Sequence, residues 1–240
     1  MQFQLFTLFP EMFPGFLGHS LAGQALARGD WGFDAINIRN FATDRHKTVD
    51  DAPFGGGAGM VMRPDIVGAA FDSVPNLGYS IYLSPRGEPL TQKLAYELSQ
   101  KQTLSLLCGR YEGVDQRAIE AYNCHEISIG DYILSGGEVA ALTLMDAIIR
   151  LLPNVLGNAD TLAQESFGIS SQNLLEYNHY TRPANWLDKN GVMRIIPNVL
   201  TSGHHQQVAQ WRKNQAESIT QQRRPDLWQL YQALPENKKN

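Results

Sequence analysis

Two glycine-rich loops follow each other closely in the middle of this 240-residue chain: CGRYEGVDQR at residues 108–117 and ISIGDYILSGGE at residues 127–138. Each follows a short apolar run typical of a strand and leads into a helical pattern. Glycine lets the backbone approach a ligand closely, because it has no Cβ atom and tolerates positive φ. A third loop, YLSPRG at residues 82–87, also ends a strand pattern. Since ligands of open α/β sheets bind beyond the carboxyl ends of strands, we expect the three loops to form one site.

On either side of these loops, residues 1–157 alternate between strand and helix patterns. Runs rich in β-branched, leucine and aromatic residues predict strands at 2–8, 33–39, 79–83, 103–108 and 125–129. Apolar residues at helical spacing predict helices at 12–28, 65–73, 91–101, 114–122 and 138–151. This alternation predicts an α/β fold with a mostly parallel sheet and helices on its faces.

The remainder of the chain has a different pattern. Residues 158–171 are polar with weak periodicity, which predicts a flexible linker. From about residue 174 onward we find no strand pattern, and helices are expected at 206–221 and 225–234. We therefore expect a small helical C-terminal domain over residues 172–240, with the tail 236–240 frayed.

Composition excludes several classes of protein. A hydrophobic fraction of 43% and a charged fraction of 18% are those of a folded globular protein. No apolar run reaches the roughly 18 residues of a membrane span, and the N-terminus lacks the basic start of a signal peptide. Cys108 and Cys124 form no CxxC and have no further cysteine or histidine at ligand spacing. We expect two reduced thiols, no dedicated metal site and a cytoplasmic protein without a membrane partner.

Charge is unevenly distributed along the chain. Residues 1–157 hold 11 Lys+Arg and 17 Asp+Glu, a net charge of −6, whereas residues 158–240 hold 9 and 7, a net of +2. The second part clusters its basic side chains at His204, His205, Arg212, Lys213, Arg223 and Arg224. A locally basic face on an acidic protein fits selective contact with a polyanion. An ordinary solvated helix face explains the same charges.

Common nucleotide motifs do not account for the glycines. The run GGGAG at residues 55–59 lacks the Lys-Ser/Thr of a phosphate-binding P-loop, and taken alone it favours a flexible turn. No GxGxxG follows the first strand pattern, which argues against a Rossmann dehydrogenase.

Several motifs in order along the chain carry a family resemblance. The N-terminal part contains FTLFPEMF (6–13), GGGAGM (55–60), LSPRG (83–87), CGRYEGVD (108–115) and SIGDY (128–132). The C-terminal part contains HYTRP (179–183), SGHH (202–205), WR (211–212) and RRPDL (223–227). With these motifs the chain resembles the bacterial tRNA (guanine-N1-)-methyltransferases, the TrmD type of the SPOUT methyltransferases, over nearly its whole length.

The resemblance implies a fold and a cofactor. It implies a trefoil-knotted α/β domain over residues 1–157, a flexible linker over 158–171 and a helical tRNA-binding domain over 172–240. It also implies S-adenosylmethionine bound in the three loops, by residues Leu83, Ser84, Pro85, Gly109, Tyr111, Glu112, Ile129, Gly130, Asp131, Tyr132, Ile133, Leu134, Gly136 and Gly137. Backbone groups of glycine loops are suited to bind adenine edges and ribose hydroxyls.

The implied reaction is methyl transfer to N1 of guanine-37, next to the anticodon of tRNA. That nitrogen carries a proton, so a base must remove it while a cation holds the charge that develops on O6. By position, the resemblance assigns these roles to Glu165 and Arg150. The residues alone favour a simpler interpretation, in which Glu165 is a solvated side chain in a polar segment and Arg150 a cation complementing a helix C-terminus.

Partners follow from the same resemblance. It implies a homodimer with the active site at the subunit interface, and it suggests Mg²⁺ as an assisting ion near Glu112. It places the tRNA contacts at His46, Gly55, Gly59, Ser166, Arg182, His205, Arg212 and Arg223. The alternatives are a SPOUT methyltransferase acting on another RNA position, and a catalytically silent RNA-binding homologue.

The sequence departs from the family pattern at a few places. Glu165 stands where the family has Asp, which keeps the carboxylate but lengthens the side chain by one methylene. Residues 168–178 and 184–196 form longer stretches than usual, and Ala58 replaces a frequent Pro. The longer stretches affect the expected RNA contacts and not the chemistry, whereas the changed reach of Glu165 predicts a slower reaction rather than an inactive enzyme.

Overall fold

The computed structural model describes residues 1–156, 165–167 and 173–235 of the chain. Contacts divide the chain into two compact units, Met1–Gly157 and Asn158–Asn240. They are called the N-terminal and the C-terminal unit. A separate linker over residues 158–171 stays a prediction, because of these residues only 165–167 are described.

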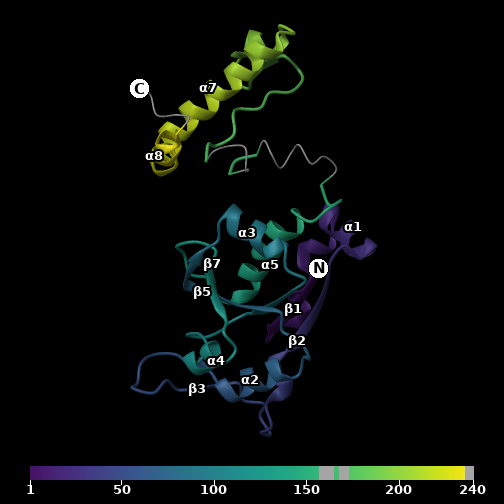
Figure 1. Ribbon diagram of the computed structural model, residues 1–240, viewed down its shortest axis with the longest axis vertical. Coiled ribbons are helices and arrows are strands. Elements are labelled where there is room, and N and C mark those ends of the chain that lie inside the picture. Colours follow the sequence, from purple (N-terminus) through teal and green to yellow (C-terminus); the bar gives the residue numbers. More distant parts are fainter. Residues whose placement is uncertain (157–164, 168–172, 236–240) are drawn as a thin grey trace. The chain divides into compact units, whose positions relative to one another are not determined.

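A five-stranded parallel sheet forms the centre of the N-terminal unit (Figure 1). Its strands are β1 (Gln2–Thr7), β2 (Gly32–Asn37), β5 (Tyr79–Pro89), β6 (Thr103–Leu107) and β7 (His125–Ser128). They lie in the order β2-β1-β6-β5-β7, and every neighbouring pair is parallel. The strands are short and apolar because both faces of the sheet are covered. The predicted α/β class and parallel sheet are confirmed.

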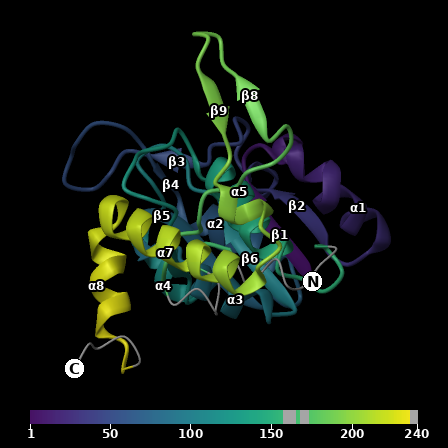
Figure 2. The ribbon, with the colours of Figure 1, turned by 90° about the horizontal axis from the view of Figure 1, so that it is seen from above.

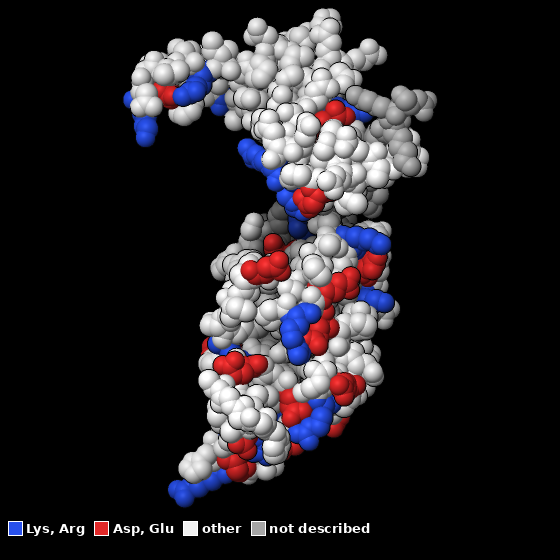
Figure 3. Space-filling view, turned by 90° about the vertical axis from the view of Figure 1, so that its left-hand side faces the viewer, with Lys and Arg blue, Asp and Glu red and all other residues white. Residues whose placement is uncertain are grey.

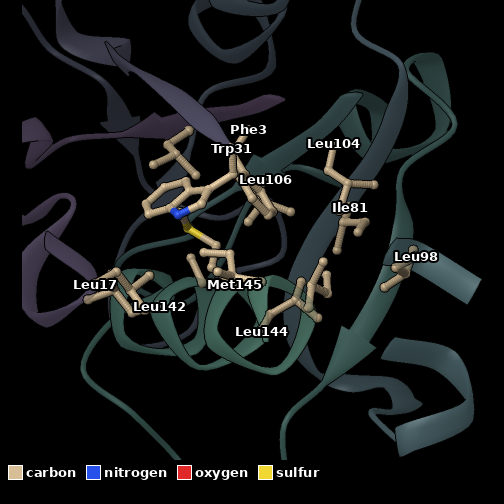
Figure 4. Packing of buried hydrophobic residues seen from close by; sticks show 14 of the residues in the cluster. Phe3, Leu17, Trp31, Ile81, Leu98, Leu104, Leu106, Leu142, Leu144 and Met145 are labelled. Atoms are coloured by element: carbon tan, nitrogen blue, oxygen red, sulfur yellow. The ribbon is translucent and has the colours of Figure 1, made fainter. Parts of the chain in front are cut away.

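Helices cover the sheet on its two faces (Figure 1). They are α1 (Ser20–Arg28), α2 (Pro64–Asp72), α3 (Gln92–Ser99), α4 (Gln116–Ala121) and α5 (Gly137–Ile149). One apolar cluster joins the sheet to α1, α3 and α5, and includes Trp31, Leu106 and Met145 (Figure 4). A second cluster joins it to α2 and α4, around Phe6 and Phe71, whose ring centres lie 4.4 Å apart. The sheet therefore lies between two well-packed layers.

Two boundaries in the N-terminal unit differ from the sequence prediction. The helix expected at 12–28 is broken into the 3₁₀ turns Pro10–Met12 and Gly15–Gly18 followed by α1, because Pro14 and the left-handed Gly15 (φ 55°) interrupt helical hydrogen bonding. Strand β5 runs on to Pro89 instead of ending at Leu83. Its pairing with β7 shifts register between Leu83 and Glu88, so the Pro85-Arg86-Gly87 segment is an irregularity inside the strand.

The glycine run at residues 55–59 lies in the loop of a small antiparallel hairpin formed by β3 (Asp50–Asp51) and β4 (Val61–Met62). Gly55, Gly56, Gly57 and Gly59 all have positive φ, between 79° and 126°. Residues with a side chain rarely adopt these backbone conformations, which is the physical reason for glycine at these positions. Phe54, beside them, is fully exposed.

The three strand-end loops cross closely at one edge of the sheet. The Gly137 N–H donates to the Gly109 carbonyl at 2.9 Å, and a Cβ atom at Gly137 would lie 2.6 Å from Cys108 Cα. A Cβ atom at Gly87 would likewise meet the backbone of Glu126 and Ile127. Only glycine permits such crossings. The knot that the family resemblance implies stays a prediction.

The C-terminal unit contains two strands that the sequence analysis did not predict. Strands β8 (Asn185–Leu187) and β9 (Met193–Ile195) form an antiparallel hairpin that stands clear of helices α7 (His205–Arg223) and α8 (Pro225–Ala233) (Figure 2). The expectation of no strands after residue 174 is therefore wrong. The sequence signal for this hairpin that the analysis missed is Asn190-Gly191, a dipeptide typical of hairpin turns, between two apolar runs.

A small core holds the C-terminal unit together. Leu174, Ala216 and Tyr231 are buried, with Trp228 and Leu234 packed against them. The buried Thr220 hydroxyl accepts from Leu175 N at 2.8 Å and donates to the Ala216 carbonyl at 2.7 Å. Side-chain hydrogen bonds thus attach the segment before β8 to helix α7.

Candidate active site

A pocket of about 480 Å³ lies where the three loops of the N-terminal unit meet. Its volume falls in the range of sites for small molecules and cofactors. Residues 82–86, from β5, form one part of the wall, residues 109–114, after β6, a second, and residues 127–137, from β7 to α5, the third. The pocket therefore lies at the carboxyl ends of parallel strands, as the loops predict.

The pocket brings together all the residues expected to bind the cofactor except Asp131. Its lining includes Leu83, Ser84, Pro85, Gly109, Tyr111, Glu112, Ile129, Gly130, Tyr132, Ile133, Leu134, Gly136 and Gly137. Asp131 is exposed and lies outside the lining. Their role in binding stays a prediction, but their meeting in one cavity is a fact of the fold.

Glycines create the space in this pocket. A Cβ atom at Gly109 would lie 2.9 Å from the Tyr82 ring, and one at Gly136 would lie 2.5 Å from Arg110 Cζ. Gly136 has φ of 175°, an extended conformation open to any residue, so space is its only requirement. Tyr111 has a φ of 57°, a left-handed conformation that a non-glycine residue adopts at a cost in free energy. This places strain within the loop that lines the pocket.

Sequence reasoning missed several residues of the pocket wall, most importantly Arg110. Its Nη2 lies 2.8 Å from Glu138 Oε2, and its Nη1 donates to the Ser135 carbonyl at 3.2 Å. Other lining residues that were not expected are Val61, Tyr82, Arg86, Gly113, Val114, Gln116, Ile127, Ser128, Ser135 and Ala140. Arg110 and Glu138 come from two different loops, and nothing in their sequence positions indicates that they pair.

Burial shifts the ionisation of groups beneath and beside the pocket. Cys108 is completely buried, so the pKa of its thiol is raised well above its usual value, with the Glu138 charge adding to the effect. Burial also raises the pKa of the Tyr82 hydroxyl. Both groups are therefore neutral at pH 7, and Cys108 is an inert structural thiol rather than a nucleophile.

The pocket mouth exposes apolar side chains. Among the lining residues, Tyr132 is 53% exposed and Ile133 81%. Large apolar side chains grouped on a surface indicate a contact site for another molecule.

The two residues expected to be catalytic belong to different units. Arg150 is the C-cap of α5 and half-buried, a position that also suits a cation complementing the helix C-terminus. Glu165 belongs to the C-terminal unit and is half-buried. Next to it, Ser166 accepts from Glu176 N at 2.9 Å, and Phe167 has a φ of 64°. The local fold therefore holds the Glu165 segment against the segment preceding β8.

Residues expected to contact tRNA lie on exposed surfaces of both units. His46, Gly55 and Gly59 lie in exposed loops on either side of β3 in the N-terminal unit, and Arg182, His205, Arg212 and Arg223 are exposed in the C-terminal unit. Ser166 differs from these, because it is half-buried and its hydroxyl accepts a backbone hydrogen bond. On the face shown in Figure 3, both signs of charge are mixed over the N-terminal unit.

Aromatic side chains surround the cations of the C-terminal unit, and sequence reasoning missed them. Arg212 Cζ lies 4.8 Å from the ring centre of Tyr177, and the His179 ring lies 4.8 Å from that of Tyr177. Tyr180 and Trp211 pair at 6.1 Å. Aromatic rings interleaved with cations are suited to stack on bases while neutralising phosphates.

The described residues contain no group of three or more histidine, cysteine or acidic side chains placed to hold a metal ion. Among them there is also no helix long and apolar enough to cross a membrane.

Comparison with known proteins gives one consistent result. A family model, tRNA (Guanine-1)-methyltransferase TrmD, matches residues 1–230. The chain belongs to this family. A tRNA (guanine-N(1)-)-methyltransferase of Rhodospirillum rubrum is 60% identical over 228 residues, which cover 95% of this chain and 92% of that protein. Proteins of the same description from Bartonella henselae and Brucella ovis are 57% and 55% identical, over 96% and 94% of this chain and 97% and 90% of theirs. The family resemblance inferred from the motifs is confirmed.

Proposed function

We propose that this protein transfers a methyl group from S-adenosylmethionine to N1 of guanine-37 in tRNA. The observation that carries the proposal is the pocket at the meeting of three glycine loops, in a chain that belongs to the tRNA (guanine-1)-methyltransferase family. The exposed aromatic and cationic surface of the C-terminal unit suits an RNA substrate. tRNA is a cytoplasmic substrate, so we place the reaction in the cytoplasm.

The pocket fits the proposed methyl donor. Gly109, Gly136 and Gly137 let the loops approach one another closely, because a Cβ atom at any of them would meet neighbouring protein atoms. The glycine-rich walls that result are suited to bind a purine edge and hydroxyl groups through the backbone. Apolar side chains of Leu83, Ile129 and Ile133 offer surface for the base and the aliphatic part of the ligand. The donor, when bound, supplies an activated sulfonium methyl group, so the transfer requires positioning more than acid catalysis.

Guanine N1 becomes a nucleophile only when its proton is removed. We assign that step to the Glu165 carboxylate, because it stands at the position of the family's base and a carboxylate can accept the proton. Negative charge then develops on guanine O6, and we assign its stabilisation to the Arg150 guanidinium. Glu165 replaces the Asp of the family, so we expect base catalysis with an altered reach and not its loss.

The proposal also includes the homodimer that the family resemblance implies, in which each site draws Arg150 from one subunit and Glu165 from the other. The exposed apolar side chains of the pocket lining, Tyr132 and Ile133, suit burial against a second subunit. Mixing Arg150→Ala with Glu165→Ala subunits tests this arrangement. Mixed dimers should regain activity, since half of their sites hold both intact residues. No recovery after proven subunit exchange would indicate sites built within one chain.

Mg²⁺ enters the proposal only as an optional assistant near Glu112. The described residues offer no three-ligand cluster for an ion, so no step is assigned to a metal. Removing divalent ions with a chelator during the methyl transfer assay measures the contribution of Mg²⁺.

The experiment that tests the proposed function is methyl transfer from labelled S-adenosylmethionine to unmodified tRNA transcripts. Transcripts that differ only in the guanines beside the anticodon should show that label enters guanine-37. Label at a different nucleotide would favour a SPOUT methyltransferase with another target. Binding of donor and tRNA without any transfer would favour a silent RNA-binding homologue, the alternative that Glu165 in place of Asp favours.

A further inference from the structure

An ion pair between Arg110, in the wall of the pocket, and the buried Glu138 has no role in the chemistry described so far. Arg110 projects from loop 109–113 to Glu138, in the first turn of α5, where Nη2 and Oε2 lie 2.8 Å apart. The Glu138 side chain is 1% exposed, and its Oε1 accepts from Thr7 Oγ1 at 2.7 Å. Because Thr7 ends β1, the carboxylate joins three elements that are far apart in sequence.

Arg110 also contacts the other loop of the pocket. Its Nη1 donates to the carbonyl of Ser135, and its Cζ lies 4.4 Å from the ring centre of Phe9. One guanidinium therefore links loop 109–113, loop 134–137 and the start of α5. It also contacts Phe9, the residue before the 3₁₀ turn Pro10–Met12. Two of the three pocket loops are held directly by this side chain.

Gly136 shows that the position of Arg110 is restricted. A Cβ atom there would lie 2.5 Å from Arg110 Cζ, although the extended backbone of Gly136 would accept any residue. What glycine provides at this position is room for the guanidinium. The loop sequence and the Arg110 side chain are thus fitted to each other.

Stability alone is a poor reason for the pair. Desolvating two charges offsets most of their attraction, and apolar replacements of similar size are often as stable. Arg110 Nε and Glu138 Oε2 are also buried without a hydrogen bond of good geometry among the described residues, despite the 2.8 Å contact of Oε2 with Nη2. An incompletely satisfied ion pair contributes little to the free energy of unfolding, so we interpret its role as fixing the positions of the two loops.

We propose that Arg110 is a positioning residue, held by Glu138, that keeps loops 109–113 and 134–137 in the arrangement that binds the methyl donor. This inference rests on the proposed function. It requires no contact between Arg110 and the donor, because the residue acts through the two loops that line the pocket.

Paired apolar replacements separate positioning from stability. Arg110→Met and Glu138→Leu are made singly and together, and each protein is measured for Tm and for S-adenosylmethionine affinity by calorimetry. Each single variant leaves an unpaired buried polar group or charge, so Tm should fall. The double variant should regain most of the parent Tm. Its donor affinity should stay roughly 10- to 100-fold weaker, the range that supporting residues show in metal sites.

Parental affinity in a double variant with parental Tm would overturn the inference. A parent that binds no S-adenosylmethionine would instead overturn the proposed function, so the two failures are distinguishable. Arg28→Met is the matched control, because Arg28 forms an exposed ion pair with Asp30 at 2.7 Å on the N-terminal unit. This variant should keep both Tm and affinity.

Gly136→Ala keeps the inference testable if the double variant does not fold. In the parent, the added methyl group displaces Arg110 and should weaken donor binding roughly tenfold or more. In an Arg110→Ala background, the same change should cost nothing further, because the guanidinium is gone. An equal loss in both backgrounds would show that the methyl group meets the donor directly and would contradict the role of Arg110.

Discussion

The two units of the chain bury their apolar residues very differently. Large side chains are fully buried on both faces of the N-terminal sheet, Phe3 and Trp31 on one face (Figure 4) and Phe6 on the other. The C-terminal unit buries little beyond Leu174, Ala216 and Tyr231, and exposes rings and cations. The pocket expected to bind the cofactor thus lies on a well-packed core, whereas the proposed RNA surface consists of side chains on a thin core. A rigid site suits a small donor, and an adaptable surface suits a large polyanion.

The largest effect is expected from filling the rigid pocket. Gly109→Leu places a side chain in space bounded by the Tyr82 ring, 2.9 Å from where Cβ would lie. S-adenosylmethionine binding should become undetectable by calorimetry, because the preformed wall leaves no room for both. Circular dichroism and Tm establish that the variant is folded. Normal binding by a folded Gly109→Leu protein would remove this loop from the site.

Core truncation should distinguish the two units next. Leu106→Ala leaves a cavity in a fully buried layer of the N-terminal unit and should lower the free energy of unfolding by about 2–5 kcal/mol. Leu174→Ala should fall at the low end of that range, about 2 kcal/mol, because its partly solvated surroundings relax more easily. Amide hydrogen exchange resolves the loss in each unit separately. A larger loss for Leu174→Ala would contradict the contrast between the cores.

RNA affinity should depend on the cations of the C-terminal unit. Arg212→Ala removes the guanidinium stacked on Tyr177 and should weaken tRNA binding about equally for all tRNA sequences. The slope of log K against log salt should fall by about 1, measured by filter binding over a salt series. Arg63→Ala is the control, since that guanidinium is bonded to Asp65 at 2.6 Å in the N-terminal unit. An unchanged slope for Arg212→Ala would exclude a phosphate contact.

The smallest effect concerns the exposed hairpin β8–β9. The pKa of Asp188 is lowered by the Val192 N–H and then by the Arg194 guanidinium, whose Nη2 lies 2.9 Å away. A depressed folded pKa gives stability that is present above the unfolded value of about 3.9 and is lost as pH falls through the folded value. The hairpin should therefore loosen below about pH 4, seen as a change in Trp186 fluorescence that Asp188→Asn abolishes. A pH-independent signal would contradict this.

Sequence patterns were sufficient for the sheet but not for every helix and strand. Apolar runs located the five parallel strands within a few residues, because a sheet buried on both faces requires such runs. The prediction of one helix over residues 12–28 did not take account of Pro14 and Gly15, which interrupt helical hydrogen bonding. Hairpin β8–β9 was missed because its strands are only three residues long and all their side chains are exposed. Strands without a buried face do not show the alternation of apolar and polar residues from which strands are predicted.

The parts of the candidate site that are formed by backbone loops could be predicted from the sequence. Glycines at strand ends identified the loops, and the pocket contains every expected cofactor residue but Asp131. Arg110 and Glu138 could not be paired from sequence, because their contact depends on how two loops cross in space. The same holds for Tyr177 and Arg212, which lie on different segments of the C-terminal unit.

The central claim is that Glu165 is the base that deprotonates guanine N1. Single-turnover methyl transfer by Glu165→Gln tests this claim most directly. The substitution keeps size and hydrogen bonding but cannot accept a proton. The rate should fall roughly 10²–10⁴-fold, with S-adenosylmethionine affinity unchanged and with Glu165→Asp at least as fast as the parent. A Glu165→Gln protein that methylates guanine-37 as fast as the parent would contradict the account.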